Sequence, residues 1–124
     1  MRKVVLQLLA VYFLAMAVYI FCLPQLFFDS TPGLAAMGPF NLHFIRDVSF
    51  AFLVSGGAML YGARLGRKDI LIIGSAWPFL HALFHSYIWM RRGIPFDFIW
   101  LSDFIGVVLP GLMALALSIK SPRK

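Results

Sequence analysis

Six ionisable side chains lie within the long apolar segments of this sequence or at their rims. These are His43, Arg46, Asp47, His81, His85 and Asp103. An ionisable group at membrane depth costs at least about 2.5–3.5 kcal/mol, so each of these side chains requires a partner or a function. His81 and His85 are four residues apart in the sequence and therefore share one face of a helix. His43 and Asp47 have the same spacing.

Metal binding is one chemistry that this set of side chains could perform. Two imidazoles on one helix face, together with a carboxylate from another helix, are donors suited to a transition metal. The sequence offers His81 and His85 as the imidazoles, with Asp47 and Asp103 as the carboxylates. The His-Glu-x-x-His motif is absent, because residues 82–84 are Ala, Leu and Phe. The spacing is therefore compatible with a metal site without specifying one.

Haem and quinone are two further cofactors to weigh. A bis-histidine haem needs ligands on its opposite faces, which His81 and His85 cannot provide from the same side of one helix. His43 would have to supply the second ligand. A quinone could stack among the aromatic side chains near the outer end of the bundle, although aromatic rings are also common there as membrane anchors.

Packing and proton relay are the alternatives to a cofactor site. Arg46 can neutralise Asp47 or Asp103, and histidines in membrane bundles form hydrogen bonds between helices. Membrane-embedded histidines and aspartates also carry protons in transporters. The small multidrug transporters depend on an acidic residue in the first helix, and Gln7 is the only strongly polar side chain there.

Four long apolar runs provide the elements that hold these side chains. The chain has 124 residues, of which 61% are hydrophobic and 13% charged, and its mean hydropathy is +0.87. A soluble domain carries about 25% charged residues, and a run of about 20 apolar residues spans a bilayer core. The sequence therefore predicts an all-α integral membrane four-helix bundle in a single domain, residues 1–124. The expected spans are residues 4–23, 42–63, 70–90 and 99–119.

The segments between the spans carry turn signals. Pro24 ends the first span, residues 25–40 are expected to form a loop, and Asn41 is a plausible N-cap of the second helix. Arg2 and Lys3 before an apolar run also describe a signal peptide. The apolar run continues to Leu23 without a polar region, so we expect an uncleaved helix.

Basic residues predict the orientation of the bundle. The formal charge of +6 accompanies no nucleic-acid-binding module, so no nucleic-acid partner is expected. One side collects eight basic residues, against three on the other, which places both termini in the cytoplasm. The eight are Arg2, Lys3, Arg64, Arg67, Lys68, Lys120, Arg123 and Lys124. All six ionisable side chains of the cluster then belong to the outer half, at depths of up to roughly 14 Å.

The second apolar run carries a family resemblance. Residues 46–62 read RDVSFAFLVSGGAMLYG, a polar start followed by an apolar helix with glycines towards its end. This run resembles the second helix of small DoxX-like membrane proteins, and the four-span arrangement is similar over nearly the whole chain. The resemblance implies a prokaryotic inner-membrane protein. Some DoxX-like proteins are associated with quinone-linked oxidation of sulfur compounds or with redox-stress complexes. Cys22 is the only cysteine, and no catalytic residue is carried over.

The leading hypothesis is a non-enzymatic accessory membrane subunit that serves a redox complex. Its expected partners are the lipid bilayer and other membrane subunits or a second copy of the chain. A metal- or haem-binding redox protein is the second hypothesis, and a small proton-coupled transporter is the third.

Overall fold

Four long helical spans make up the chain in this computed structural model, which describes residues 1–121. The first three are α1 (Arg2–Cys22), α3 (Leu42–Leu65) and α4 (Lys68–Arg91). The fourth runs through α5 (Phe98–Asp103), the π-helical turn η2 (Phe104–Val108) and α6 (Leu109–Ile119). Each span is long and apolar enough to cross a membrane. The prediction of an all-α bundle of four candidate membrane helices is confirmed. Arg123 and Lys124, which contributed to the expected orientation, lie outside the described residues.

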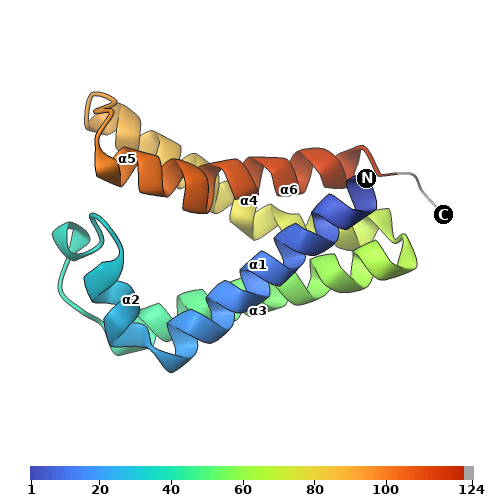
Figure 1. The fold of residues 1–124 in the computed structure, drawn as a ribbon, viewed down its shortest axis with the longest axis horizontal. Coiled ribbons are helices and arrows are strands. Elements are labelled where there is room, and N and C mark those ends of the chain that lie inside the picture. The colour runs from blue at the N-terminus through green and yellow to red at the C-terminus, as the bar shows by residue number, and fades with distance from the viewer. Residues whose placement is uncertain (122–124) are drawn as a thin grey trace.

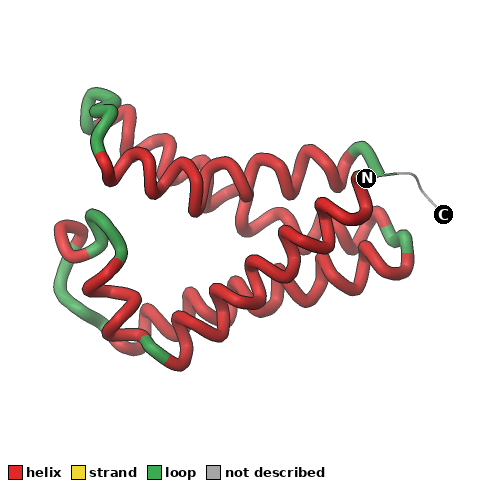
Figure 2. The backbone as a smooth tube through the Cα atoms, in the orientation of Figure 1, coloured by secondary structure: helices red, strands yellow, loops and turns green. Residues whose placement is uncertain are grey.

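The spans pack in chain order. The helix α1 lies along α3, α3 along α4, and α4 along α6 (Figure 1). At the end where α1 begins and α6 finishes, the four spans lie close together. Towards the opposite end, the α1–α3 pair and the α4–α6 pair diverge, as the tube drawing shows (Figure 2). That opposite end also carries the two longer connections, residues 23–41 and 92–97.

The connection between the first two spans is partly helical, so the prediction of a loop over residues 25–40 was wrong for residues 25–30 and 35–37. It forms α2 (Pro24–Ser30) and the short 3₁₀ turn η1 (Ala35–Met37). Pro24 starts α2 because proline has no amide hydrogen and its fixed φ suits the first helical position. Gln25 then donates to Asp29 at 3.0 Å within α2. The Tyr19 and Ser30 hydroxyls, 3.1 Å apart, connect this helix to the end of α1.

Side-chain caps start the second and fourth spans. The Phe44 amide donates to the Asn41 side chain at 3.1 Å, which confirms the predicted N-cap of α3. The Trp100 amide donates to Asp97 at 2.7 Å at the start of α5. This hydrogen bond, supported by Arg92, holds the pKa of Asp97 below its usual range. Both caps satisfy amide groups that the first helical turn leaves unpaired.

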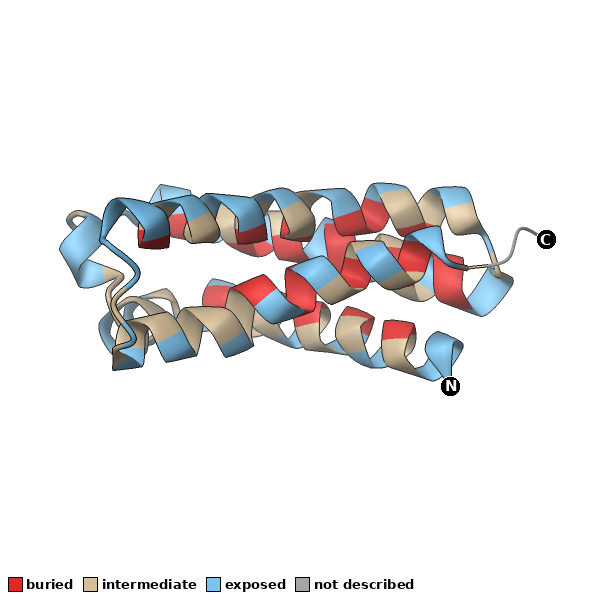
Figure 3. Cartoon of the chain, turned by 90° about the horizontal axis from the view of Figure 1, so that it is seen from above, coloured by how far each residue is buried: buried red, intermediate tan, exposed pale blue. Residues whose placement is uncertain are grey.

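The core follows one face of α1 and the facing side of α3 (Figure 3). Buried residues recur every three or four positions along α1, the spacing of a single helix face. They are Leu6, Ala10, Phe13, Ala17 and Ile20. Their partners on α3 include Ile45, Phe52, Met59 and Ala63.

Small residues allow the helices to approach closely. A Cβ added at Gly56 would lie 2.9 Å from the Ala10 carbonyl oxygen of α1. A Cβ added at Gly111 of α6 would overlap the Pro78 carbonyl oxygen of α4 and lie 2.8 Å from the Ala82 Cβ. Glycine at these positions lets backbones come into contact, as is common in membrane bundles.

Replacing Gly111 with alanine is expected to lower the free energy of unfolding by about 1–3 kcal/mol, because the added methyl has no space against Pro78. Gly57→Ala is the matched control, since nothing lies within 4 Å of a Cβ added there. Thermal unfolding of both variants in mild detergent measures the difference. Equal melting temperatures for the two variants would contradict this packing.

Candidate functional site

Asp103 accepts hydrogen bonds from two side chains of α4. Its Oδ2 atom lies 2.9 Å from His85 Nδ1 and 3.1 Å from Trp89 Nε1. The side chains of His85 and Asp103 are 21% and 14% exposed, and Trp89 is buried. An ionised carboxylate only accepts, so His85 donates its Nδ1 hydrogen and a neutral ring keeps Nε2 as an acceptor. The geometry therefore positions one imidazole nitrogen to take up or release a proton.

His81 extends this group by one helical turn. Its ring lies edge to face with that of His85, with 4.6 Å between centroids. On its other side it stacks on Trp77 at 4.8 Å with an interplanar angle of 12°. Trp77, His81 and His85 therefore form a continuous row of rings along α4 that ends at Asp103. The two histidines lie one turn apart on the same side of α4, and His85 is the one that contacts Asp103.

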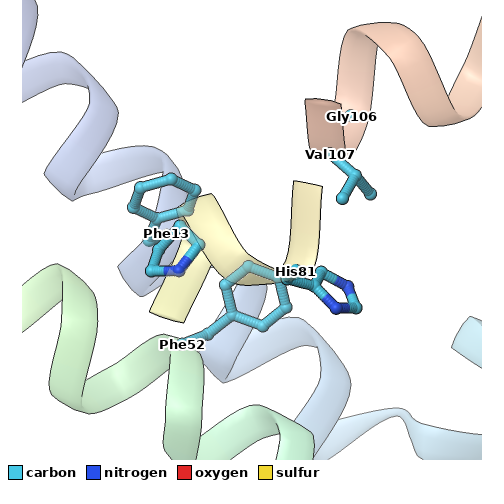
Figure 4. A pocket seen from close by; sticks show the side chains of 6 residues that line it. Phe13, Phe52, His81, Gly106 and Val107 are labelled. Carbon is cyan, nitrogen blue, oxygen red and sulfur yellow. The ribbon is translucent and has the colours of Figure 1, made fainter. Parts of the chain in front are cut away.

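A small pocket lies beside His81 and receives residues from all four spans (Figure 4). Its volume is about 10 Å³, close to the space that one water needs. The lining consists of Phe13, Phe52, Pro78, His81, Gly106 and Val107. The rings of Phe52 and His81 approach edge to face at 6.4 Å. His81 is the one ionisable side chain at this pocket.

The π-helical turn on the far side of the pocket has a chemical cause. In a regular α-helix the Gly106 carbonyl would accept from residue 110, but Pro110 has no amide hydrogen. The backbone widens here instead, and the Leu109 amide donates to Phe104 five residues earlier. The Tyr12 hydroxyl of α1 donates to the Gly106 carbonyl at 2.6 Å. This bond connects α1 to the fourth span beside the pocket.

Aromatic rings continue from Trp89, which donates to Asp103. Trp89 contacts Trp100, with 5.6 Å between the ring centroids. Trp100 and Phe104 stack in parallel, with 5.4 Å between centroids and 2° between planes. The donor to Asp103 is therefore part of a row of three packed rings.

Asp47 does not join the histidines of α4, contrary to the expected four-ligand set. Its Oδ2 lies 3.2 Å from His43 Nε2, and these two side chains are 56% and 90% exposed. Asp47 follows the buried Ile45 by two residues and precedes the buried Ser49 by two. At about 100° per residue, it therefore lies on the opposite side of α3 from the core. His43 lies on the same outward side of α3, so it does not face the histidines of α4 as the two ligands of one haem would have to.

Arg46 also differs from expectation. Its guanidinium lies 5.2 Å from the centre of the Phe21 ring, in a cation–π contact with the end of α1. The ion pairs found within residues 1–121 include neither Arg46 with Asp47 nor Arg46 with Asp103. The predicted cluster of six is thus divided into an interior group (His81, His85, Asp103), an exposed pair (His43, Asp47) and Arg46.

The separation of Asp47 from His81, His85 and Asp103 bears directly on the predicted metal site. Over the described part of the chain, no three His, Cys, Asp or Glu side chains are grouped so as to hold a metal ion. The sequence argument missed two further side chains that form hydrogen bonds in this region, Trp89 and Tyr12. Trp89 lies four residues after His85, so the same helix-face spacing could have identified it. Tyr12 could have been found only from the packing of α1 on the fourth span.

No family model, curated protein or solved structure matches this chain. The resemblance to DoxX-like proteins therefore stays a prediction.

Replacing Asp103 with alanine is expected to lower the free energy of unfolding by about 2 kcal/mol, because two largely buried donors lose their acceptor. Asp47→Ala removes an equal charge from an exposed pair and is expected to cost less than about 0.5 kcal/mol. Chemical or thermal unfolding in mild detergent compares the two. If Asp47→Ala lowered the stability as much as Asp103→Ala does, the hydrogen bonds that His85 and Trp89 donate to Asp103 would not stabilise the bundle.

Proposed function

We propose that this chain is an accessory subunit of a membrane redox complex and that His85 and Asp103 handle protons for that complex. The observation that carries this proposal is the hydrogen bond between His85 Nδ1 and Asp103 Oδ2 at 2.9 Å inside the outer half of the bundle. Proton uptake at His85 Nε2 would give an imidazolium ion stabilised by the adjacent carboxylate. Release from the same nitrogen restores the neutral ring.

Two further features support a proton-handling role. His81 contacts the His85 ring and borders the small pocket, so a second imidazole lies one turn deeper in α4. The side chains of His85 and Asp103 are only 21% and 14% exposed, which limits their direct exchange with bulk water. Redox reactions of lipid-soluble carriers consume and release protons, and a partly shielded imidazole beside a carboxylate is suited to that exchange. The association of some DoxX-like proteins with quinone-linked oxidation points in the same direction.

We also propose that the chain lies in a prokaryotic inner membrane with both termini in the cytoplasm. Support comes from the distribution of basic residues, which favours the end of the bundle that holds Arg2, Arg64 and Lys120. In this orientation His85 and Asp103 lie nearer the outer surface, where protons are exchanged with the periplasmic side.

Electron flow in membranes from a host that lacks this chain tests the proposal. Oxygen consumption is measured with each respiratory substrate of the host, between pH 6 and pH 8. Restoring the wild-type chain or the Asp47→Asn variant is expected to restore the missing activity. Asp103→Asn is expected to restore it at least about tenfold less well, because positioned proton transfer contributes about 10²–10⁴ in rate.

Immunoblots establish that the variants reach the membrane in equal amounts. Two results would contradict the proposal. The first is that removal of the chain leaves electron flow unchanged with every substrate. The second is that Asp103→Asn restores electron flow as fully as Asp47→Asn does.

A further inference from the structure

Basic side chains at the ends of all four spans gather at the end of the bundle opposite the interior group. Arg2 and Lys3 lie at the start of α1, Arg64 in the last turn of α3, and Lys120 directly after α6. The loop between α3 and α4 adds Arg67, and α4 begins with Lys68. This end is the one at which the four spans lie close together (Figure 1).

Two hydrogen bonds join these side chains into one surface. The Arg2 guanidinium donates to the Lys120 carbonyl oxygen. The Lys3 ammonium donates to the Arg64 carbonyl oxygen at 3.4 Å. Arg2 therefore lies beside Lys120 at the end of α6, and Lys3 lies beside Arg64 at the end of α3. We call these four residues the basic cradle.

The cradle retains most of its hydrogen-bonding capacity. A guanidinium has five N–H donors and an ammonium has three, and each of these two bonds uses one donor. Among residues 1–121, no carboxylate forms an ion pair with Arg2, Lys3, Arg64 or Lys120. Arg67 differs, because it pairs with Asp69 at 2.6 Å. The positive charge of the cradle is therefore not neutralised within the described part of the protein.

Apolar side chains continue from the cradle along the outside of the helices. Val4 and Leu8 of α1 are 56% and 64% exposed; Val4 directly follows Lys3, and Leu8 lies about one turn further along the helix. Leu65 at the end of α3 and Ile119 at the end of α6 are each 50% exposed. A ligand that matches both features needs an anionic group at the cradle and hydrocarbon beside it.

We propose that the basic cradle binds the headgroup of an anionic phospholipid. The phosphate accepts hydrogen bonds from Arg2 and Lys3, with Arg64 and Lys120 adding positive charge, and the acyl chains lie along Val4 and Leu8. Basic surfaces between membrane helices are known to hold anionic headgroups in this manner. A free phosphate would match the positive charge of the cradle, but it would not cover the exposed apolar side chains beside it. The proposal does not depend on the redox function.

Lipid-dependent thermal stabilisation of the full chain in mild detergent tests the cradle. Phosphatidylglycerol is titrated against phosphatidylcholine of the same acyl composition. The wild type is expected to gain thermal stability with phosphatidylglycerol alone. In Arg2→Gln/Lys3→Gln the apparent affinity is expected to fall about 25-fold, because each basic residue near an anionic headgroup contributes roughly fivefold.

Arg91→Gln/Arg92→Gln is the matched control, since it removes the same charge from the opposite end, and its affinity is expected to stay within about twofold of the wild type. Arg2→Lys/Lys3→Arg retains the charges and is expected to bind, which separates lost binding from lost folding. Equal stabilisation by phosphatidylcholine, or equal weakening in both glutamine variants, would overturn the proposal. Equal stabilisation by inorganic phosphate would show a site for free phosphate and would also overturn it.

Discussion

A polar group inside a bundle of apolar helices must find its hydrogen-bond partner within the protein, because hydrocarbon offers none. The interior of this chain follows that requirement throughout residues 1–121, where no buried side-chain nitrogen or oxygen lacks a partner. Serine hydroxyls return to carbonyls of their own helices, as Ser75 does to Ile72 at 3.0 Å. Tyr12, His85 and Trp89 instead form hydrogen bonds to the fourth span, and these bonds help to position that span.

Three such bonds hold the fourth span against the rest of the bundle. Pro110 leaves the Gly106 carbonyl without its usual donor, and the Tyr12 hydroxyl of α1 occupies the vacant position. Three residues before Gly106, Asp103 accepts hydrogen bonds from His85 and Trp89 of α4. The small pocket beside His81 lies among these contacts. The side chains able to handle protons are therefore held by the same bonds that assemble the helices.

The sequence predicted the elements well and the directions of their faces less well. Apolar runs of membrane length located all four spans. Spacing showed that His43 and Asp47 share a face of α3, but it could not show which face points inward. Hydrophobicity does not separate the interior of a membrane bundle from its lipid-facing side. On α3 the buried face includes Ser49 and Ser55, whereas the exposed face includes Phe44 and Val54. Residues 24–30 were missed as a helix because a segment of about two turns that starts with proline shows little periodicity.

The protonation of the His85 ring tests the central claim most directly. Nitrogen-15 NMR of the histidine side chains in lipid nanodiscs distinguishes a protonated Nδ1 from a protonated Nε2. In the neutral ring the account predicts hydrogen on Nδ1, held by Asp103, and an unprotonated Nε2. It also predicts that Asp103→Asn shifts both resonances of His85, while Asp47→Asn leaves them in place. Hydrogen on Nε2 in the wild type, with the same spectrum in Asp103→Asn, would contradict the account.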